Sequence, residues 1–522
     1  MVDYEVAVIG AGISGLAALK SFLDKNLSVI CLEKSDDIGG LWNFSENGYG
    51  VMRFTHINVS KQNFVFSDFP FPDEVPDFPH HTHIMKYIRD YAEHFNLLKH
   101  ISFSSIVVSI RRLPDNQWKI TFDKGKYETR EGLQTVTVRN VAIATGHHSN
   151  PYIPKIPGEE SYMGTMYHSV KYKCAESSSI QQGKRVLVVG MGNSAVDIAD
   201  NMVTQGLCQV DISARSPSWI VPPYLLGYPA DHFAIRALFS LLPLHIVDHI
   251  IQTIVCVVSG LPKKWGVYPL TSILRSQITV SHTLYHLIQR GSVLVRPDIS
   301  NLGPGKKVTF SDGSLGWYDG IILATGYTFN LPFLSKNDRE HIMPGVNELN
   351  LYKNVFSPRF GHTLGLIGFV EPAASGGMVT MSELQSRWMA ELVCGTVHLP
   401  TPTEMQNAQL QDRSWEKSWY YSSKRNTILK IPILYNDGIA EIIGAKPVFS
   451  KNPILAWRLL LSVSAFQWRL NGPNSWNGAK EMCKKIKPVP VYHYFMLLLI
   501  AILFIILLGF LRFVFRILSQ LL

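Results

Sequence analysis

Two glycine-rich turns carry the residues whose types and spacing are most indicative of chemistry. The first turn consists of Gly10, Ala11, Gly12, Ile13, Ser14 and Gly15. In this pattern the first glycine permits a tight turn, the second lets a pyrophosphate approach the backbone, and the third lets a helix pack closely on a strand. The start of that helix offers free N–H groups and a positive dipole end to the phosphates. Glu33 stands 23 residues after Gly10, where a carboxylate accepts ribose hydroxyls, so we predict a dinucleotide site.

The loop after Glu33 extends this site. Its glycine pair, Gly39 and Gly40, is followed by Leu41 and Trp42. An acidic strand end followed by a second glycine loop is more typical of FAD sites than of NAD sites, because the long flavin dinucleotide needs room for its phosphate and ribityl chain. We therefore predict FAD as the ligand of the first turn, with Gly40, Leu41 and Trp42 among its contacts.

The second turn repeats the pattern with an alanine in place of the third glycine, which the pattern allows. Its residues are Gly190, Gly192, Asn193, Ser194, Ala195, Val196 and Asp197. At 25 residues past Gly190 there is no acid, and Arg215 stands there instead. An arginine at this place pairs with a 2′-phosphate, which an acid would repel. The second ligand is therefore predicted to be NADPH, although Arg215 taken alone could be a surface arginine at a strand end.

Alternating strand and helix patterns position these turns. Residues 5–9 and 27–32 are Val/Ile-rich and predict strands, with a helix over 13–25 between them, and the same order recurs from 185–189 onward. Such alternation indicates an α/β fold with two Rossmann-like dinucleotide-binding domains.

Two Ala-Thr-Gly segments, at 144–146 and 324–326, each end a buried strand and resemble crossovers between dinucleotide domains. They predict a split FAD domain with the NADPH domain inserted in it. The expected order is an FAD domain over 1–153, an NADPH domain over 154–330, a second FAD part over 331–445, a C-terminal region over 446–490 and a membrane anchor over 491–522.

An apolar helical segment over about 219–291 interrupts the NADPH domain. Its longest apolar stretch, 239–258, contains Pro243 and Asp248, which exclude a bilayer span. Three interpretations remain open: a helix lying on a membrane, the lining of a substrate channel, or a helical subdomain packed on the core.

Residues 495–511 contain no charge and are almost entirely Leu, Ile, Phe and Met. A helix of about 17 residues rises about 26 Å, close to the ~27 Å core of the endoplasmic reticulum bilayer. The N-terminus has no signal-peptide pattern. We therefore expect a C-terminal tail anchor in the endoplasmic reticulum membrane, contact with membrane lipid, and a catalytic domain facing the cytosol. A buried core helix is the alternative.

Composition excludes other classes of protein. The net charge of +9 is explained by basic flanks of the apolar run and by sites for polyanionic ligands, so no nucleic-acid partner is expected. The six cysteines form no C-x-x-C pair and no cluster with histidine, so no metal site is predicted.

The chain resembles the flavin-containing monooxygenases of animal microsomes over essentially its whole length. The family motif F-x-G-x-x-x-H-x-x-x-Y/F stands at Tyr162, Gly164, His168 and Tyr172, with tyrosine at its first position. The family's F-A-T-G-Y motif stands at 323–327, altered only at Leu323. Residues 58–61, 67–71 and 383–388 are also similar to the family.

The resemblance implies that NADPH reduces the flavin, that molecular oxygen forms a C4a-hydroperoxyflavin, and that this oxidant oxygenates a tertiary amine or a sulfide. The flavin supplies this chemistry, and the protein excludes water and donates hydrogen bonds. Asn58 matches the family's active-site asparagine and is the expected donor to the peroxide, with Val59 beside it in the cofactor site. His168 is expected to orient the linker between domains.

Three rival functions are weighed against this one. A Baeyer–Villiger monooxygenase shares both nucleotide folds but usually has Trp where this chain has Tyr172. A pyridine nucleotide–disulfide oxidoreductase needs a redox cysteine pair, which the sequence lacks. The intact set Gly10, Glu33, Arg215 and Asn58 argues against a membrane-tethered NADPH-binding sensor that has lost turnover. A weakly coupled NADPH oxidase stays open as an alternative.

Overall fold

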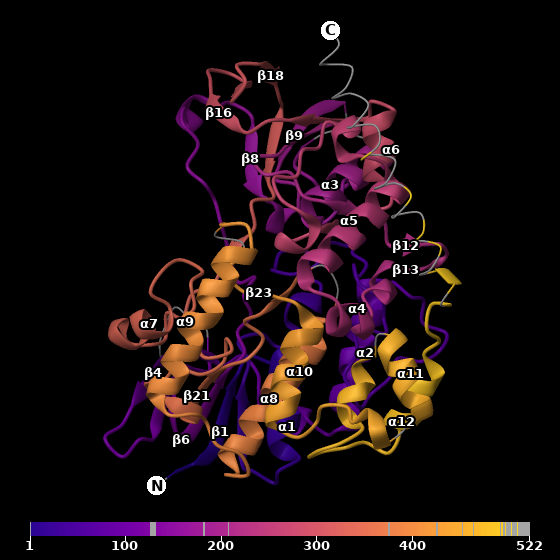
Figure 1. The fold of residues 1–522 in the computed structure, drawn as a ribbon. Helices are drawn as coiled ribbons and strands as arrows, with labels where there is room; N and C mark the ends of the chain where they lie inside the picture. Colours follow the sequence, from indigo (N-terminus) through magenta and orange to yellow (C-terminus); the bar gives the residue numbers. More distant parts are fainter. Residues whose placement is uncertain are drawn as a thin grey trace.

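The computed structural model describes residues 2–125, 132–180, 183–206, 208–373, 376–423, 426–451, 453–462 and 464–490, together with Tyr492, His493, Met496, Leu499, Leu503 and Gly509. Within this described part, two separate, largely parallel sheets are packed with helices, and a helical C-terminal region lies beside the first sheet (Figure 1). The mixed α/β architecture with two Rossmann-like sheets confirms that part of the predicted fold class.

The first sheet has the strand order β3-β2-β1-β6-β5-β4, with β21 beside β6. Its strands are β1 (Tyr4–Ile9), β2 (Val29–Leu32), β3 (Ile101–Ser102), β4 (Ile106–Arg112), β5 (Trp118–Asp123), β6 (Leu133–Ile143) and β21 (Leu364–Leu366). The long strand β6 pairs twice: its first half runs antiparallel to β5, and its last residues run parallel to β1 and β21. Strand β21, which follows all strands of the second sheet in the sequence, therefore completes the first sheet.

Three helices pack on this sheet: α1 (Ile13–Leu23), α2 (His81–His94) and α8 (Met378–Val393). Leu16 and Phe22 of α1 are fully buried with Trp388 of α8 in the same apolar core. Helix α1 is shorter at its end than predicted, because Asn26 takes a positive φ of 57° and begins the turn to β2.

The second sheet has the order β15-β10-β9-β19-β8, and all its pairs are parallel. Its strands are β8 (Thr165–His168), β9 (Lys184–Val189), β10 (Cys208–Ser213), β15 (Val293–Arg296) and β19 (Gly320–Leu323). Helix α3 (Asn193–Thr204) packs on it, and an antiparallel sheet of β16 (Ile299–Leu302), β17 (Lys307–Phe310) and β18 (Leu315–Trp317) adjoins it.

The two crossovers between the sheets lie side by side. Strand β7 (Asn150–Pro151) pairs antiparallel with β20 (Tyr327–Thr328), so the chain leaves the first sheet and returns to it at one place. This arrangement agrees with the predicted insertion of one domain in the other. The exact boundaries at 153, 330 and 445 stay predictions.

The inserted segment after β10 is helical. It contains the short pairs β11 (Ile220–Val221) with β14 (Thr279–Val280) and β12 (Tyr224–Leu225) with β13 (Tyr228–Pro229), and the helices α4 (Arg236–Leu241), α5 (Leu244–Ser259) and α6 (Leu284–Gln289). Pro243 separates α4 from α5 and is the N-cap of α5, a position where its missing N–H costs no helical hydrogen bond.

The remaining helices follow the return of the chain. They are α7 (Lys336–Ile342), α9 (Pro402–Trp419), α10 (Pro432–Ile442), α11 (Pro453–Leu461) and α12 (Ala479–Lys485). Arg469, just before α12, is buried and forms ion pairs with Glu383 of α8 and, at 2.9 Å, with Asp68. These charges attach the C-terminal region to the first sheet's helices.

Among the described residues, no helix combines the length and apolarity needed to cross a bilayer. The predicted anchor at 491–522, with its apolar run at 495–511, lies outside the described residues apart from the six positions named above.

Candidate functional site: two dinucleotide turns and an apolar cavity

The first glycine turn joins β1 to α1 in a geometry that side chains would block. Gly10 has a φ of +100°, and a Cβ built there would lie 2.7 Å from the carbonyl oxygen of Ala144. A Cβ on Gly15 would lie 1.8 Å from the carbonyl oxygen of Gly10. Gly12 is the N-cap of α1 and offers no side-chain cap, so the first N–H groups of the helix stay open to an anion.

The other residues of this turn hold its shape. Ala11 is buried, Ile13 packs partly buried against the core, and Ser14 Oγ lies 2.9 Å from Ser382 Oγ on α8. Glu33, at the end of β2, is buried, and its Oε2 accepts from the Ala11 N–H at 2.6 Å. The predicted carboxylate is therefore fixed directly beside the turn.

The second glycine loop is laid against the first. Gly40 has a φ of +57°, and a Cβ built there would come within 3.2 Å of the Gly12 Cα. Leu41 is exposed beside it, and the Trp42 ring stands edge-on to Phe64 with centroids 5.1 Å apart. The structure thus brings the first turn, Glu33 and Gly40 together, and Leu41 and Trp42 follow Gly40 in the chain.

The second turn joins β9 to α3 in the same way. Gly190 has a φ of +119°, and a Cβ there would lie 2.4 Å from the carbonyl oxygen of Ala324. Gly192 is the N-cap of α3 without a side-chain cap. Ser194 is exposed at the helix start, whereas Ala195 and Val196 are buried in the core of the second sheet.

Asn193 and Asp197 of α3, both predicted to contact the second dinucleotide, have other properties in the structure. Asn193 Oδ1 accepts from the Val280 N–H of β14 at 2.9 Å, so its side chain attaches the inserted segment to the turn. Burial, with a smaller effect of the Asp200 charge, raises the pKa of the Asp197 carboxyl to about 7.

Arg215 lies two residues after the end of β10, and β10 is the strand next to β9. The buried carboxylate of Asp211 on the same strand is occupied by Arg185 at 2.9 Å and by Arg296 at 3.0 Å. In the described part of the chain no carboxylate pairs with Arg215, whose side chain is exposed. Its pairing with a 2′-phosphate stays a prediction.

Asn58 and Val59 line a cavity of about 260 Å³. Its other walls are mostly aliphatic and aromatic and come largely from the inserted segment, including Leu225, Phe233, Leu238, Ile251, Ile254 and Val280. Residues of the inserted segment thus line a cavity, and the use of this segment as a substrate channel or as a membrane contact stays a prediction.

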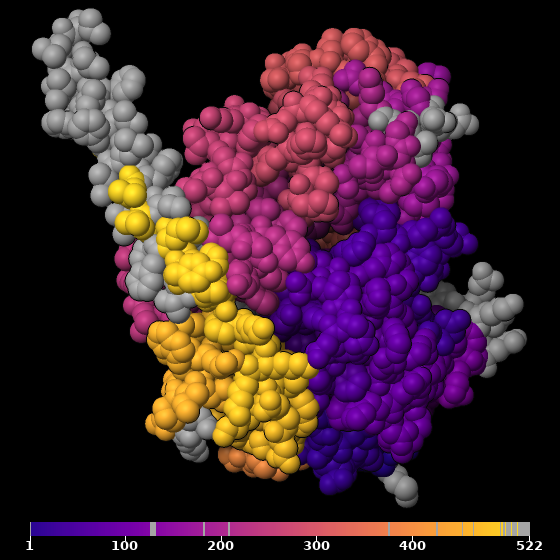
Figure 2. Space-filling model, turned by 90° about the vertical axis from the view of Figure 1, so that its right-hand side faces the viewer, coloured from indigo at the N-terminus to yellow at the C-terminus, as the bar shows by residue number. Residues whose placement is uncertain are grey.

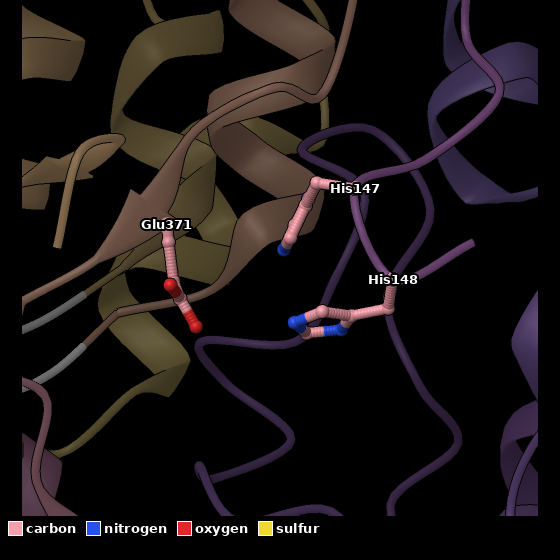
Figure 3. A group of neighbouring side chains, drawn as sticks. All are labelled: His147, His148 and Glu371. Atoms are coloured by element: carbon pink, nitrogen blue, oxygen red, sulfur yellow. The ribbon is translucent and has the colours of Figure 1, made fainter. Parts of the chain in front are cut away.

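A polar cluster that sequence analysis missed lies near the crossovers. His147, His148 and Glu371 place ligand atoms within 4.8 Å of one another, and Figure 3 shows both rings turned toward the carboxylate. His147 donates from Nδ1 to the Gly368 carbonyl at 3.1 Å, so its buried Nε2 carries a lone pair. These residues are far apart in sequence, and only the adjacent histidines after Gly146 could have drawn attention to them.

The residue that orients His147 lies close to the start of α1. A Cβ built on Gly368 would lie 2.2 Å from Ser14 Oγ, so the residue whose carbonyl accepts from His147 packs against that helix start. The Glu371 carboxylate also accepts a hydrogen bond from Gln277 Nε2.

The residues present fit two dinucleotides. Both turns have glycine-only geometry and uncapped helix starts, the first is matched with the acid Glu33, and the second with the cation Arg215. The first would accept ribose hydroxyls and the second a 2′-phosphate.

Comparison with known proteins gives a family. The model for the flavin-binding monooxygenase-like family matches residues 3–487. Flavin-containing monooxygenase 3 of Homo sapiens is 36% identical over 499 residues, covering 91% of this chain and 90% of that protein.

Solved structures share the fold. S-allyl-L-cysteine S-oxygenase from Allium sativum has a TM-score of 0.63 at 20% identity, covering 92% of this chain and 99% of its own. The OTEMO complex with FAD and NADP has a TM-score of 0.63 at 16% identity, covering 84% of this chain and 98% of its own. With the two turns, these matches show that the chain belongs to the flavin-binding monooxygenase-like family and is a flavin-containing monooxygenase that uses FAD and NADPH.

Proposed function

We propose that this enzyme oxygenates soft nucleophilic nitrogen or sulfur atoms of small apolar molecules, with NADPH as reductant and molecular oxygen as co-substrate. The cavity beside Asn58 is the proposed substrate chamber. Its apolar walls favour an uncharged molecule, and an amine or sulfide reacts through the lone pair of its neutral form.

One observation supports the proposal: the cavity walls connect the residue expected to contact the flavin with the second glycine turn. Asn58 and Val59 form one wall, and Val280 forms another. Because the Val280 N–H is bonded to Asn193 at the start of α3, that wall is attached to the second turn. A molecule in the cavity would thus lie between the asparagine and the NADPH-side turn.

The cofactor roles follow the two turns. The first turn, Glu33 and the loop from Gly40 to Trp42 are proposed to hold FAD, and the second turn with Arg215 to hold NADPH. Bound together, the cofactors supply the electrons and the oxygen-activating chemistry. Asn58 is proposed to donate a hydrogen bond from its amide, which has no titratable proton and so serves over a wide pH range.

The enzyme is also proposed to sit on a membrane through its inserted segment and its C-terminal tail. Leu241, Ile246, Val258 and Leu261 of the α4–α5 region are exposed, Leu241 to 75%. The C-terminal region reaches the inserted segment, since Val489 is buried with Leu225 and Phe233, and Figure 2 shows yellow and magenta atoms in contact there. The predicted anchor at 491–522 would start beside this apolar face, as expected for an endoplasmic reticulum tail anchor.

Product analysis tests the substrate class. The purified enzyme is given NADPH and, separately, N,N-dimethylaniline, methyl phenyl sulfide and cyclohexanone, and mass spectrometry follows a gain of one oxygen atom. We expect the N-oxide and the sulfoxide and little lactone. Lactone as the main product would replace the proposal with Baeyer–Villiger oxygenation, and NADPH oxidation that yields only hydrogen peroxide would replace it with an oxidase.

A further inference from the structure

The inserted segment reaches across to the turn that carries Asn58 through one buried carboxylate. Asp231 lies in the short helix Ala230–Phe233, is 8% exposed, and belongs to the cavity wall. Its Oδ2 accepts from the Ser60 N–H at 2.8 Å, from Ser60 Oγ at 2.8 Å and from Asn63 Nδ2 at 2.6 Å. Three donors of one turn therefore converge on one oxygen of a residue about 170 positions away.

The bonds to Asp231 restrict Asn58 and Val59, the two residues of this turn that face the cavity. Before Asn58, the Ile57 N–H donates to the Pro79 carbonyl at 3.1 Å. After Val59, Ser60 is fully buried and held by Asp231. Only Asn58 and Val59 lie between these two fixed points, and both line the cavity.

The far side of the turn is equally confined. A Cβ built on Gly377 would lie 1.6 Å from the Asn63 carbonyl oxygen, so the turn is pressed against the segment that precedes α8. Without Asp231, the buried Ser60 N–H would lose its acceptor, and the turn, blocked on the side of Gly377, would be free to shift on the side of the cavity. Such a movement displaces Asn58 first.

We propose that Asp231 is a positioning residue that holds Asn58 in place for oxygen transfer, so that the segment that builds the substrate cavity also sets how much activated oxygen reaches substrate. This proposal rests on the role proposed above for Asn58. Asp231 lines the proposed substrate cavity, but the role proposed for it is exerted through Ser60 and Asn63.

The inserted segment offers a matched control. Asp248 of α5 is 4% exposed, and its carboxylate accepts from the Leu274 N–H at 2.8 Å and from Ser272 Oγ. It is thus a buried, hydrogen-bonded aspartate of the same segment that does not touch the Asn58 turn. Asp248→Ala should cost stability as Asp231→Ala does, without moving Asn58.

The experiment compares full-length holoenzymes of Asp231→Ala, Asp231→Asn, Asp248→Ala and Asn58→Leu with the unaltered enzyme. Hydrogen exchange of the peptide spanning 57–64, fragmented to resolve the Ser60 amide, reports the turn without turnover. Hydrogen peroxide released per NADPH oxidised, with N,N-dimethylaniline present, reports coupling. For Asp231→Ala we expect exchange at Ser60 roughly 10-fold faster or more, and a several-fold larger peroxide fraction.

Asp231→Asn keeps a neutral acceptor and should fall between the alanine variant and the unaltered enzyme in both measurements. Asp248→Ala should change neither. If Asp231→Ala does not fold, Asp231→Asn decides, and unchanged exchange and coupling in it overturn the proposal. Faster exchange with unchanged coupling, or equal leakage in Asp248→Ala, also overturns it.

The parallel Asn58→Leu variant separates the two proposals. If Asn58→Leu releases peroxide and Asp231→Ala does not, only the positioning role of Asp231 is wrong. If Asn58→Leu stays coupled, the role proposed for Asn58 is wrong, and Asp231 has no donor to position.

Discussion

His168, at the end of β8, forms a hydrogen bond to the returning chain. Its Nε2 lies 3.0 Å from the carbonyl oxygen of Gly326. Its Nδ1 accepts from the Val170 N–H at 3.1 Å, so the proton is on Nε2, which donates to Gly326. Burial lowers the pKa of this imidazole, which keeps it neutral. The family-motif histidine thus ties the second sheet to the second crossover, in agreement with the linking role expected from sequence.

We expect His168→Ala to lower stability and leave the pH dependence of the reaction unchanged. Loss of a buried hydrogen bond costs about 1–3 kcal/mol, or about 1–3 °C in melting temperature for a protein of this size. The exposed His286→Ala on α6 serves as the control and should change neither. A pH–rate profile that loses one ionisation in His168→Ala would contradict this structural role.

Arg215→Ala is expected to weaken NADPH binding and leave NADH binding little changed. A charged hydrogen bond to a phosphate contributes about 1.5–3 kcal/mol, or roughly 10- to 150-fold in affinity. Arg296→Ala is the matched control, because that arginine of the neighbouring strand is already bonded to Asp211. Titration of both coenzymes tests this, and equal losses for NADPH and NADH in Arg215→Ala would assign the residue to the fold.

A protein ending near Pro490 is expected to keep its flavin and to move toward the soluble fraction of a membrane preparation. The truncation removes the apolar run 495–511 but retains Val489, which packs on the inserted segment. The exposed apolar side chains of α4 and α5 should leave some peripheral binding that carbonate extraction releases. A truncated protein that resists carbonate would show that the anchor lies elsewhere.

The pH dependence of stability should carry a contribution from His147. Burial lowers its pKa to about 4, whereas an unfolded histidine titrates near ~6.5. As pH falls below ~6.5, the unfolded chain binds a proton that the folded protein does not, so this stability is complete above ~6.5 and is lost toward pH 4. His147→Gln should remove up to about 3 kcal/mol from the loss of unfolding free energy between neutral pH and pH 4.

Melting temperatures between neutral pH and about pH 5 measure the effect of His147→Gln. Relative to its own value at neutral pH, the variant should lose less than the unaltered protein on acidification. The exposed His286→Gln should follow the unaltered protein. An unchanged slope in His147→Gln would mean that another buried group dominates acid sensitivity.

Sequence reasoning succeeded where one local pattern determines the geometry. The glycines at 10, 15 and 190 are required because a Cβ would strike a named carbonyl, and such constraints leave a fixed spacing in the chain. The cavity and the His147–Glu371 cluster had no such spacing, since their residues meet only after the second sheet is inserted and the chain returns. The bond from Asn193 to Val280 was likewise unforeseen, because a fingerprint asparagine was interpreted only as a cofactor contact.

The role of Asn58 makes the sharpest prediction, because it separates two steps of the reaction. Reduction of the flavin by NADPH is expected to depend on the two turns and not on this side chain, which is exposed to the cavity and has no hydrogen-bond partner within the described chain. Its amide would act only once oxygen has reacted with the reduced flavin. Loss of a preorganised donor of this kind costs about 2–4 kcal/mol.

We therefore expect Asn58→Leu to bind FAD and to be reduced by NADPH within a few-fold of the normal rate, while it oxygenates roughly 10²- to 10³-fold less substrate. Most of the NADPH it consumes should appear as hydrogen peroxide. Asn58→Ser keeps a shorter donor and should leak less than Asn58→Leu. Anaerobic reduction kinetics, product analysis and peroxide assay on the three proteins decide the matter: if Asn58→Leu is slow in reduction and remains coupled, the side chain serves NADPH binding, and oxygen must be held by another donor of the cavity.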